Sequence, residues 1–119
     1  MTAGGFNSQE PIYIQIMTRF RREITSGEWK TGSQISTVRD LAAQLRVNPN
    51  TVQRALSELE REGLLHSERT SGRFVTDDEL KIADTREKMA CEIISNCIQG
   101  LSELGYTKDE MKTRIKEEF

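Results

Sequence analysis

The stretch NTVQR, residues 50–54, brings together four side chains that can hydrogen-bond a nucleobase. They are Asn50, Thr51, Gln53 and Arg54. Amide and guanidinium groups form paired hydrogen bonds with the edges of adenine and guanine in the major groove of DNA. These residue types therefore indicate recognition of a nucleic acid, provided that one helix presents them on a shared face.

Two predicted helices, at residues 38–45 and 49–62, position these side chains. Thr37 is a typical N-cap for the first helix; Asn48 can cap the second, and Pro49 suits its first position. Apolar residues of the second helix recur at i, i+3, i+4 and i+7, namely Val52, Ala55, Leu56 and Leu59. Two short helices joined by the three residues RVN are typical of a DNA-binding helix-turn-helix.

A helical wheel of the second helix separates its polar residues by position. Those pointing away from the apolar face are Asn50, Arg54, Ser57 and Arg61, with Thr51 and Gln53 at the margins. Its acids, Glu58, Glu60 and Glu62, all come later in the helix. This polarity suits a helix whose first turns enter the major groove, because phosphates repel carboxylates. A solvent-exposed helical hairpin has the same periodicity, so the pattern alone leaves both interpretations open.

The surrounding segments predict a winged helix-turn-helix. A helix is expected at residues 11–26, where apolar residues recur at helical spacing before Gly27. After Gly63 the pattern changes: LLHSE and RFVT flank the turn-forming RTSG, which predicts a two-stranded hairpin with Arg69 and Arg73 at its ends. The predicted fold is mainly α with a small β hairpin.

The chain beyond Asp77 is predicted to be helical, with a break at Gly105 and a capping box of Thr107 and Glu110 opening a last short helix. Its apolar stripe is too broad for a helix that buries one narrow seam. The expected dimer-interface residues are Met89, Ala90, Ile93, Ile94, Cys97, Ile98, Leu101 and Leu104. The expected organisation is a flexible N-terminus (1–10), a DNA-binding domain (11–76) and a C-terminal helical dimerisation tail (77–119).

Composition restricts the remaining classes of function. The 119 residues carry a net charge of −2, but residues 1–76 hold 10 Lys and Arg against 8 Asp and Glu, whereas residues 77–119 hold 7 against 11. The single His and two Cys argue against an enzyme, so we expect no catalytic residue, cofactor or metal site. No stretch matches a membrane span or a signal peptide, and we therefore expect a cytoplasmic protein.

From Pro11 to Val75 the sequence resembles the N-terminal domain of GntR-family bacterial transcription regulators. The resemblance is carried by Gly27 and Gly32 in a G-x-x-x-x-G pattern, by VRDLA at residues 38–42, by NTV..AL..L..EGL at 50–64 and by the closing GRFV. The short helical tail and the NPNTV segment resemble the YtrA-like subfamily, which lacks the large effector-binding domains of its relatives.

This resemblance implies a sequence-specific, double-stranded DNA-binding transcription regulator, a repressor that binds a two-fold operator as a homodimer. A helical adaptor that uses the winged fold to bind protein is the alternative. The expected DNA-binding residues are Thr37, Arg39, Asn48, Asn50, Thr51, Gln53, Arg54, Arg69, Thr70, Ser71, Gly72 and Arg73. Ser36, Pro49 and Thr70 depart from the family pattern, and Pro49 shifts the expected base readout to Asn50, Gln53 and Arg54. The operator and any small-molecule effector stay undefined.

Overall fold

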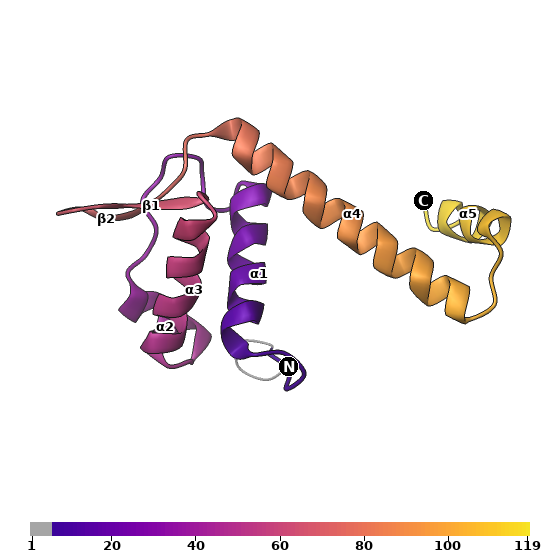
Figure 1. The fold of residues 1–119 in the computed structure, drawn as a ribbon, viewed down its shortest axis with the longest axis horizontal. Helices are drawn as coiled ribbons and strands as arrows, with labels where there is room; N and C mark the ends of the chain where they lie inside the picture. Colours follow the sequence, from indigo (N-terminus) through magenta and orange to yellow (C-terminus); the bar gives the residue numbers. More distant parts are fainter. Residues whose placement is uncertain (1–5) are drawn as a thin grey trace. The chain divides into compact units, whose positions relative to one another are not determined.

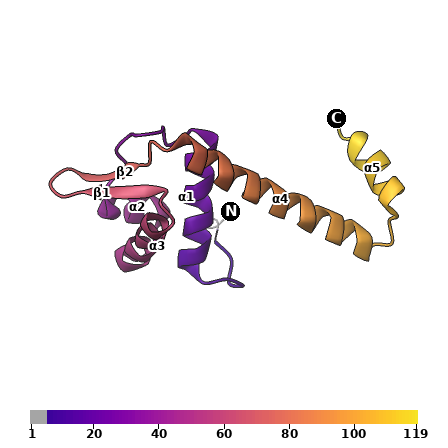
Figure 2. The ribbon, with the colours of Figure 1, turned by 45° about the horizontal axis from the view of Figure 1, so that its top comes forward.

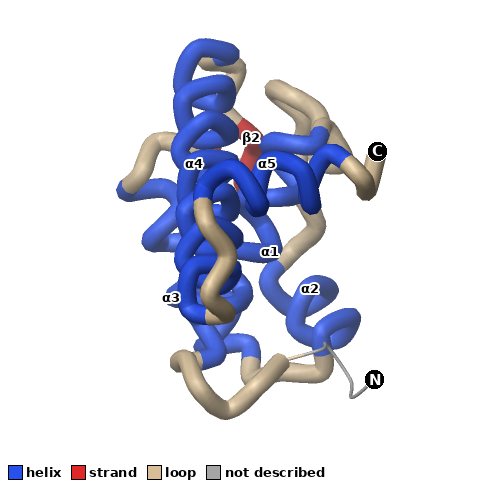
Figure 3. The backbone as a smooth tube through the Cα atoms, turned by 90° about the vertical axis from the view of Figure 1, so that its right-hand side faces the viewer, coloured by secondary structure: helices blue, strands red, loops and turns tan. Residues whose placement is uncertain are grey.

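The computed structural model describes residues 6–119, which are mostly helical (Figures 1 and 3). In chain order the elements are α1 (Ile12–Ser26), α2 (Val38–Leu45), α3 (Pro49–Arg61), β1 (Leu65–Glu68), β2 (Gly72–Val75), α4 (Glu79–Glu103) and α5 (Lys108–Lys116). The contacts define two compact units, one ending at Thr85 and the other spanning Arg86–Phe119. The mainly α fold with a small β hairpin that the sequence predicts is confirmed.

Helix α1 begins one residue later than its sequence pattern predicts. Pro11 takes the N-cap position with an extended ψ of 140°, so Ile12 is the first helical residue. Gly27 ends the helix with φ 87°, a left-handed conformation that glycine adopts without a steric penalty. The buried side chains of α1 are Ile16, Met17, Phe20 and Ile24. Tyr13, in the first turn, is only partly buried.

Helices α2 and α3 form the helix-turn-helix, and the caps predicted for both are confirmed. The Thr37 hydroxyl oxygen accepts a hydrogen bond from the Asp40 backbone N–H at 3.1 Å. The Asn48 side-chain oxygen accepts one from the Asn50 backbone N–H at 2.8 Å, and Pro49 opens α3. These caps satisfy N–H groups that would otherwise lack partners, and they fix where α3 starts.

Helix α3 lies beside α1 in the first unit (Figures 1 and 2). The two helices enclose a core with α2 and the hairpin. Its buried members are Ile16, Met17, Phe20, Ile24, Ile35, Leu41, Ala42, Leu45, Val52, Ala55, Leu56, Leu59, Leu64, Leu65 and Val75. Because all four apolar positions of α3 are in this core, its other face is left for solvent or a ligand.

The hairpin pairs β1 with β2 in antiparallel register, with Leu65 opposite Val75 (Figure 2). A third segment lies along the other edge of β2. The Ile35 N–H donates to the Arg73 carbonyl at 3.0 Å, and the Val75 N–H donates to the Ser33 carbonyl at 2.9 Å. The wing is therefore hydrogen-bonded on one side to the segment that leads into α2.

The second unit contains the C-terminal part of α4 and helix α5. The predicted capping box is confirmed: the Thr107 hydroxyl oxygen accepts from the Glu110 N–H, and the Glu110 carboxylate accepts from the Thr107 N–H at 2.9 Å. These bonds lower the pKa of the Glu110 carboxyl. An apolar groove of about 420 Å³ runs along this unit, lined by Ile93, Ile94, Cys97, Ile98, Lys108, Met111, Lys112 and Ile115. Met111 is buried, whereas α4 itself buries no side chain.

Candidate nucleic-acid interface

The outer face of α3 carries exposed amide and hydroxyl groups along its first two turns. Asn50, Gln53 and Ser57 are exposed, and Thr51 is half-buried. The Gln53 amide nitrogen lies 3.3 Å from the Ser57 hydroxyl oxygen, a long hydrogen bond for these groups. The Gln53 amide can therefore turn toward a ligand without losing a strong intramolecular bond.

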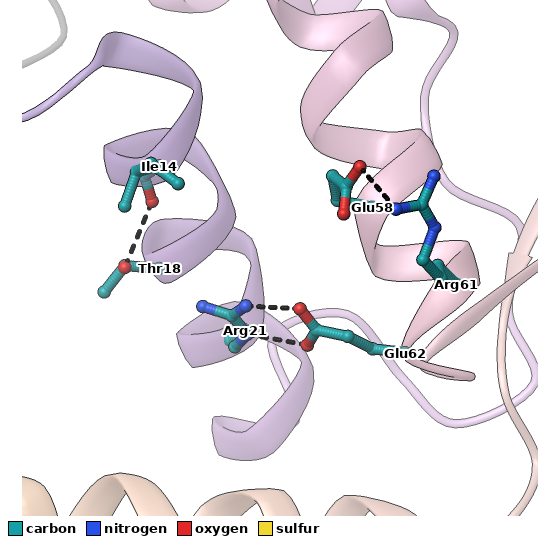
Figure 4. A network of polar contacts seen from close by, with 6 residues as sticks. All are labelled: Ile14, Thr18, Arg21, Glu58, Arg61 and Glu62. Atoms are coloured by element: carbon teal, nitrogen blue, oxygen red, sulfur yellow. Dashed lines mark hydrogen bonds and ion pairs between the residues drawn. The ribbon is translucent and has the colours of Figure 1, made fainter.

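The two carboxylates of α3, Glu58 and Glu60, and the carboxylate of its C-cap residue, Glu62, each form an ion pair with an arginine. Glu58 pairs with Arg61 on the same helix at 3.4 Å. Glu62 accepts two hydrogen bonds from Arg21 of α1, at 2.9 and 2.5 Å (Figure 4). The third acid, Glu60, lies 2.6 Å from Arg73 of β2. These carboxylates are thus paired locally with positive charge, which lowers their repulsion toward a polyanion.

Arg73, an expected DNA-binding residue, lies in β2 with its side chain turned toward α3. Its side chain is only 19% exposed and its guanidinium faces Glu60, which also accepts a hydrogen bond from the Ser67 hydroxyl at 2.5 Å. Desolvation by itself raises the pKa of the Glu60 carboxyl, but the hydrogen bonds from Ser67 and Arg73 and the charge of Arg73 outweigh it and lower the pKa. This cluster attaches both strands of the wing to α3.

We expect Arg73→Ala to lower the free energy of unfolding by about 1 kcal/mol at neutral pH, because it removes one partly exposed ion pair. The pKa of Glu60 is lower in the folded chain than its ordinary value of 4.5, so the pair stabilises the fold above that pH. Its contribution is lost as the pH falls through the folded pKa, and this part of the acid destabilisation should be absent from the variant.

Thermal unfolding between pH 3 and 7 provides the measurement, and Arg69→Ala is the matched control. Arg69 is exposed at the wing tip, and its replacement should leave the melting temperature unchanged at every pH. Equal melting curves for Arg73→Ala and the unmodified chain would show that the cluster does not stabilise the wing.

The wing tip is held in place by the loop before α2. The Gln34 side-chain nitrogen donates a hydrogen bond to the Ser71 carbonyl. Gly72 has φ 110°, a backbone conformation that residues with a side chain adopt only with strain. Arg69, Thr70 and Ser71 are exposed around this point. The tip therefore presents one arginine and several small polar groups.

The other expected DNA-binding residues lie on α2 and on the inner flank of α3. Arg39 is exposed in the first turn of α2, and Thr37 and Asn48 are exposed at the two caps. Arg54 is exposed too, but its guanidinium carbon lies 3.7 Å from the centroid of the Tyr13 ring. The structure therefore directs Arg54 toward α1, whereas Gln53 lies toward Ser57.

Several structural partners of this surface could not be found from the sequence. Tyr13, Gln34 and Glu60 each contact an expected DNA-binding residue. Their positions in the sequence are far from those of their partners, so helical or strand spacing gives no signal for them. A long-range contact of this kind becomes visible only when the core has brought the elements together.

Within residues 6–119, no set of three or more His, Cys, Asp and Glu side chains is arranged to hold a metal ion. No helix in this range has both the length and the apolar character needed to cross a bilayer. His66 stacks against Phe74, with ring centroids 5.8 Å apart, and lies 3.3 Å from a Glu68 oxygen.

The first unit contains helix α1, the capped helix-turn-helix of α2 and α3, and a two-stranded hairpin that follows α3. This combination defines the class of winged helix-turn-helix proteins. Residues 12–75 match the family model described as bacterial regulatory proteins, gntR family. The chain belongs to the GntR family of transcription regulators, which is not a class of enzymes.

Known relatives extend this similarity beyond the winged domain. The HTH-type transcriptional repressor YtrA of Bacillus subtilis is 31% identical over 92% of this chain and 85% of its own length. A GntR family transcriptional regulator from Listeria monocytogenes has a structure with a TM-score of 0.87, at 34% identity over 94% of this chain and 98% of that one. The AraR DNA-binding domain, solved in complex with operator ORX1, is 28% identical with a TM-score of 0.56, over 60% of this chain and 92% of that chain.

Proposed function

We propose that this regulator is a cytoplasmic repressor that binds a two-fold DNA operator as a homodimer, with α3 in the major groove. The observation that carries the proposal is that arginines neutralise the carboxylates of Glu58, Glu60 and Glu62. Three arginines hold Glu58, Glu60 and Glu62, so the polar face of Asn50 and Gln53 can approach phosphates with less repulsion. The names of two relatives support it, because YtrA is a repressor and the AraR domain was solved with operator DNA.

The proposed contacts divide into two kinds. Asn50, Thr51 and Gln53 face the bases, where amides pair with adenine and hydroxyls with several bases. Arg39 at the start of α2, the two caps and the wing tip around Arg69 face the backbone. Because phosphate contacts carry no sequence information, the two sets should respond differently to substitution.

The C-terminal unit supports the homodimer. An apolar groove of about 420 Å³ on a chain this small is a surface that soluble monomers rarely leave open. In a dimer with two-fold symmetry the same surface of both copies would meet, which would cover the apolar residues of the groove and supply two recognition helices for two half-sites. The groove includes Met111 and Ile115 of α5, which the sequence did not predict to be part of the interface.

Binding to a random-sequence duplex at increasing salt tests the proposal. Neutralising several phosphates releases counterions, so the logarithm of the affinity should fall steeply with the logarithm of the salt concentration. Arg69→Ala should reduce that slope by about 0.9, the value of one phosphate. Arg39→Ala should weaken binding to all duplexes about equally. A chain that binds no duplex, or binds it independently of salt, would favour the protein-binding adaptor.

A further inference from the structure

Arg54 is an exposed arginine of α3 with an aromatic partner on another helix. Its guanidinium carbon lies 3.7 Å from the centroid of Tyr13, in the first turn of α1. Arg54 follows Asn50 by four residues, so the two side chains lie one turn apart on neighbouring parts of the α3 surface. Whatever Arg54 binds must therefore lie beside the ligand of Asn50, on the side of α3 that packs against α1.

The charge of Arg54 is not used within the described chain. Among residues 6–119, no carboxylate forms an ion pair with it, although α3 and its C-cap carry three. The acid nearest to it in helical spacing, Glu58, pairs instead with Arg61 (Figure 4). Contact with the Tyr13 ring holds the side chain but does not neutralise it, so a full positive charge remains available at the surface.

Stacking on a ring leaves the useful part of a guanidinium free. The ring covers one face of the planar group, while the N–H donors point outward in its plane. That planar fork matches the oxygens of a phosphate, to which arginine donates two parallel hydrogen bonds. An arginine that is already immobilised also loses less rotamer freedom when it binds. The pair therefore has the properties of a preorganised phosphate receptor.

Resting on the DNA-binding function proposed above, we infer that Tyr13 is a positioning residue that holds Arg54 against a backbone phosphate of the operator. This assigns Arg54 to the backbone, although its place on the helical wheel suggested a base reader. The reason is direction: the ring draws the guanidinium toward α1, and consecutive residues of a helix are separated by about 100°. Gln53 therefore faces the base edges while Arg54 faces the strand that flanks the groove.

The test uses the full chain and one duplex carrying a selected operator, with affinity measured over a range of salt concentrations. Arg54→Ala should reduce the slope of the logarithmic plot by about 0.9 and leave the base preference of a selected site unchanged. Arg54→Lys should keep the slope, because the charge is kept, and still bind more weakly, because the planar fork is lost. Two substitutions of Tyr13 complete the set of four variants.

Tyr13→Leu should weaken binding by about two- to fivefold, the value of an exposed cation–π contact, and should keep most of the salt slope. Tyr13→Phe is the matched control, since it keeps the ring face, and should bind like the unmodified chain. In a double-mutant cycle, Tyr13→Leu should add little to Arg54→Ala, because both changes remove the same contact. Melting temperatures of all variants show whether the winged domain is still folded.

Three outcomes would overturn the inference: an unchanged slope for Arg54→Ala, an altered base preference for that variant, or equal losses for Tyr13→Phe and Tyr13→Leu. The first outcome would show that Arg54 does not contact a phosphate, and the second would show that it reads a base. The third would assign the effect to the tyrosine hydroxyl. Each leaves the proposed function intact if the unmodified chain binds DNA with a steep salt dependence. If the unmodified chain does not, the proposed function itself fails.

Discussion

A full-length chain carrying Ile94→Lys and Ile98→Lys is expected to sediment as a monomer at micromolar concentration. Both isoleucines line the apolar groove of the C-terminal unit, and their side chains are 58% and 45% exposed. Lys108 and Lys112 already border the groove, so two further cations would combine a desolvation penalty with repulsion. A glutamate at either position could instead pair with these lysines, which is why lysine is the sharper substitution.

Loss of the dimer should have a large effect on operator binding. When one half-site is occupied, the second contact of a dimer is intramolecular, which raises overall affinity by roughly 10² to 10⁴. The monomer should lose that factor on an operator with two half-sites and keep its affinity for a single half-site. It should also become insensitive to the spacing between half-sites, whereas the melting of the winged domain should stay unchanged.

Asn96→Lys with Gln99→Lys is the matched control for this experiment. These residues are exposed on the same helix but do not line the groove, and they add the same charge. The control should remain a dimer and bind the two-site operator normally. A dimeric groove variant, or a monomeric control, would contradict the assignment of the groove as the dimer interface.

Gln53→Ala is expected to cost on the order of 1 to 3 kcal/mol at particular base pairs, the value of one paired amide–base contact. Gln53 is exposed on α3, and its amide nitrogen lies 3.3 Å from the Ser57 hydroxyl oxygen. The loss should depend on sequence: selection from a random duplex library should return sites with relaxed preference at one position. The salt slope should stay unchanged, because no phosphate contact is removed.

Ser57→Ala serves as the control for Gln53. It removes the hydrogen-bond partner of the amide but leaves the amide in place, so base preference should persist. If Gln53→Ala leaves every position of the selected site as it was, Gln53 does not read a base. Asn50 would then be the first residue to examine, since it lies on the same exposed face.

The sequence predicted best those features that depend on neighbouring residues. Thr37, Asn48 and the Thr107–Glu110 pair are caps, whose partners lie two or three positions away, and all of them were confirmed. The hairpin and the buried face of α3 follow from periodicity in the same way. The physical reason is that these features depend on local backbone geometry and on the spacing of neighbouring residues.

Pairings across the fold were not predicted. Arg21 and Glu62 are 41 residues apart, Gln34 and Ser71 are 37 apart, and Arg73 and Glu60 are 13 apart. Each arginine could have paired with any of several carboxylates or with DNA, and composition does not choose among them. For this reason the same role was expected of Arg69 and Arg73 from the sequence. In the structure Arg69 is exposed, whereas Arg73 forms an ion pair with Glu60. The dimer interface and the DNA-contacting residues remain predictions.

The segment that pairs with the outer side of β2 also affects the behaviour of the protein at high concentration. Unpaired strand edges are templates on which other chains can add, and this leads to aggregation. Here β2 is hydrogen-bonded on both sides, by β1 and by residues 33–35, so the only open edge of the hairpin belongs to β1. That strand has four residues and ends in a charged side chain, Glu68. Molecules crowded on adjacent DNA sites therefore have little exposed edge through which to polymerise.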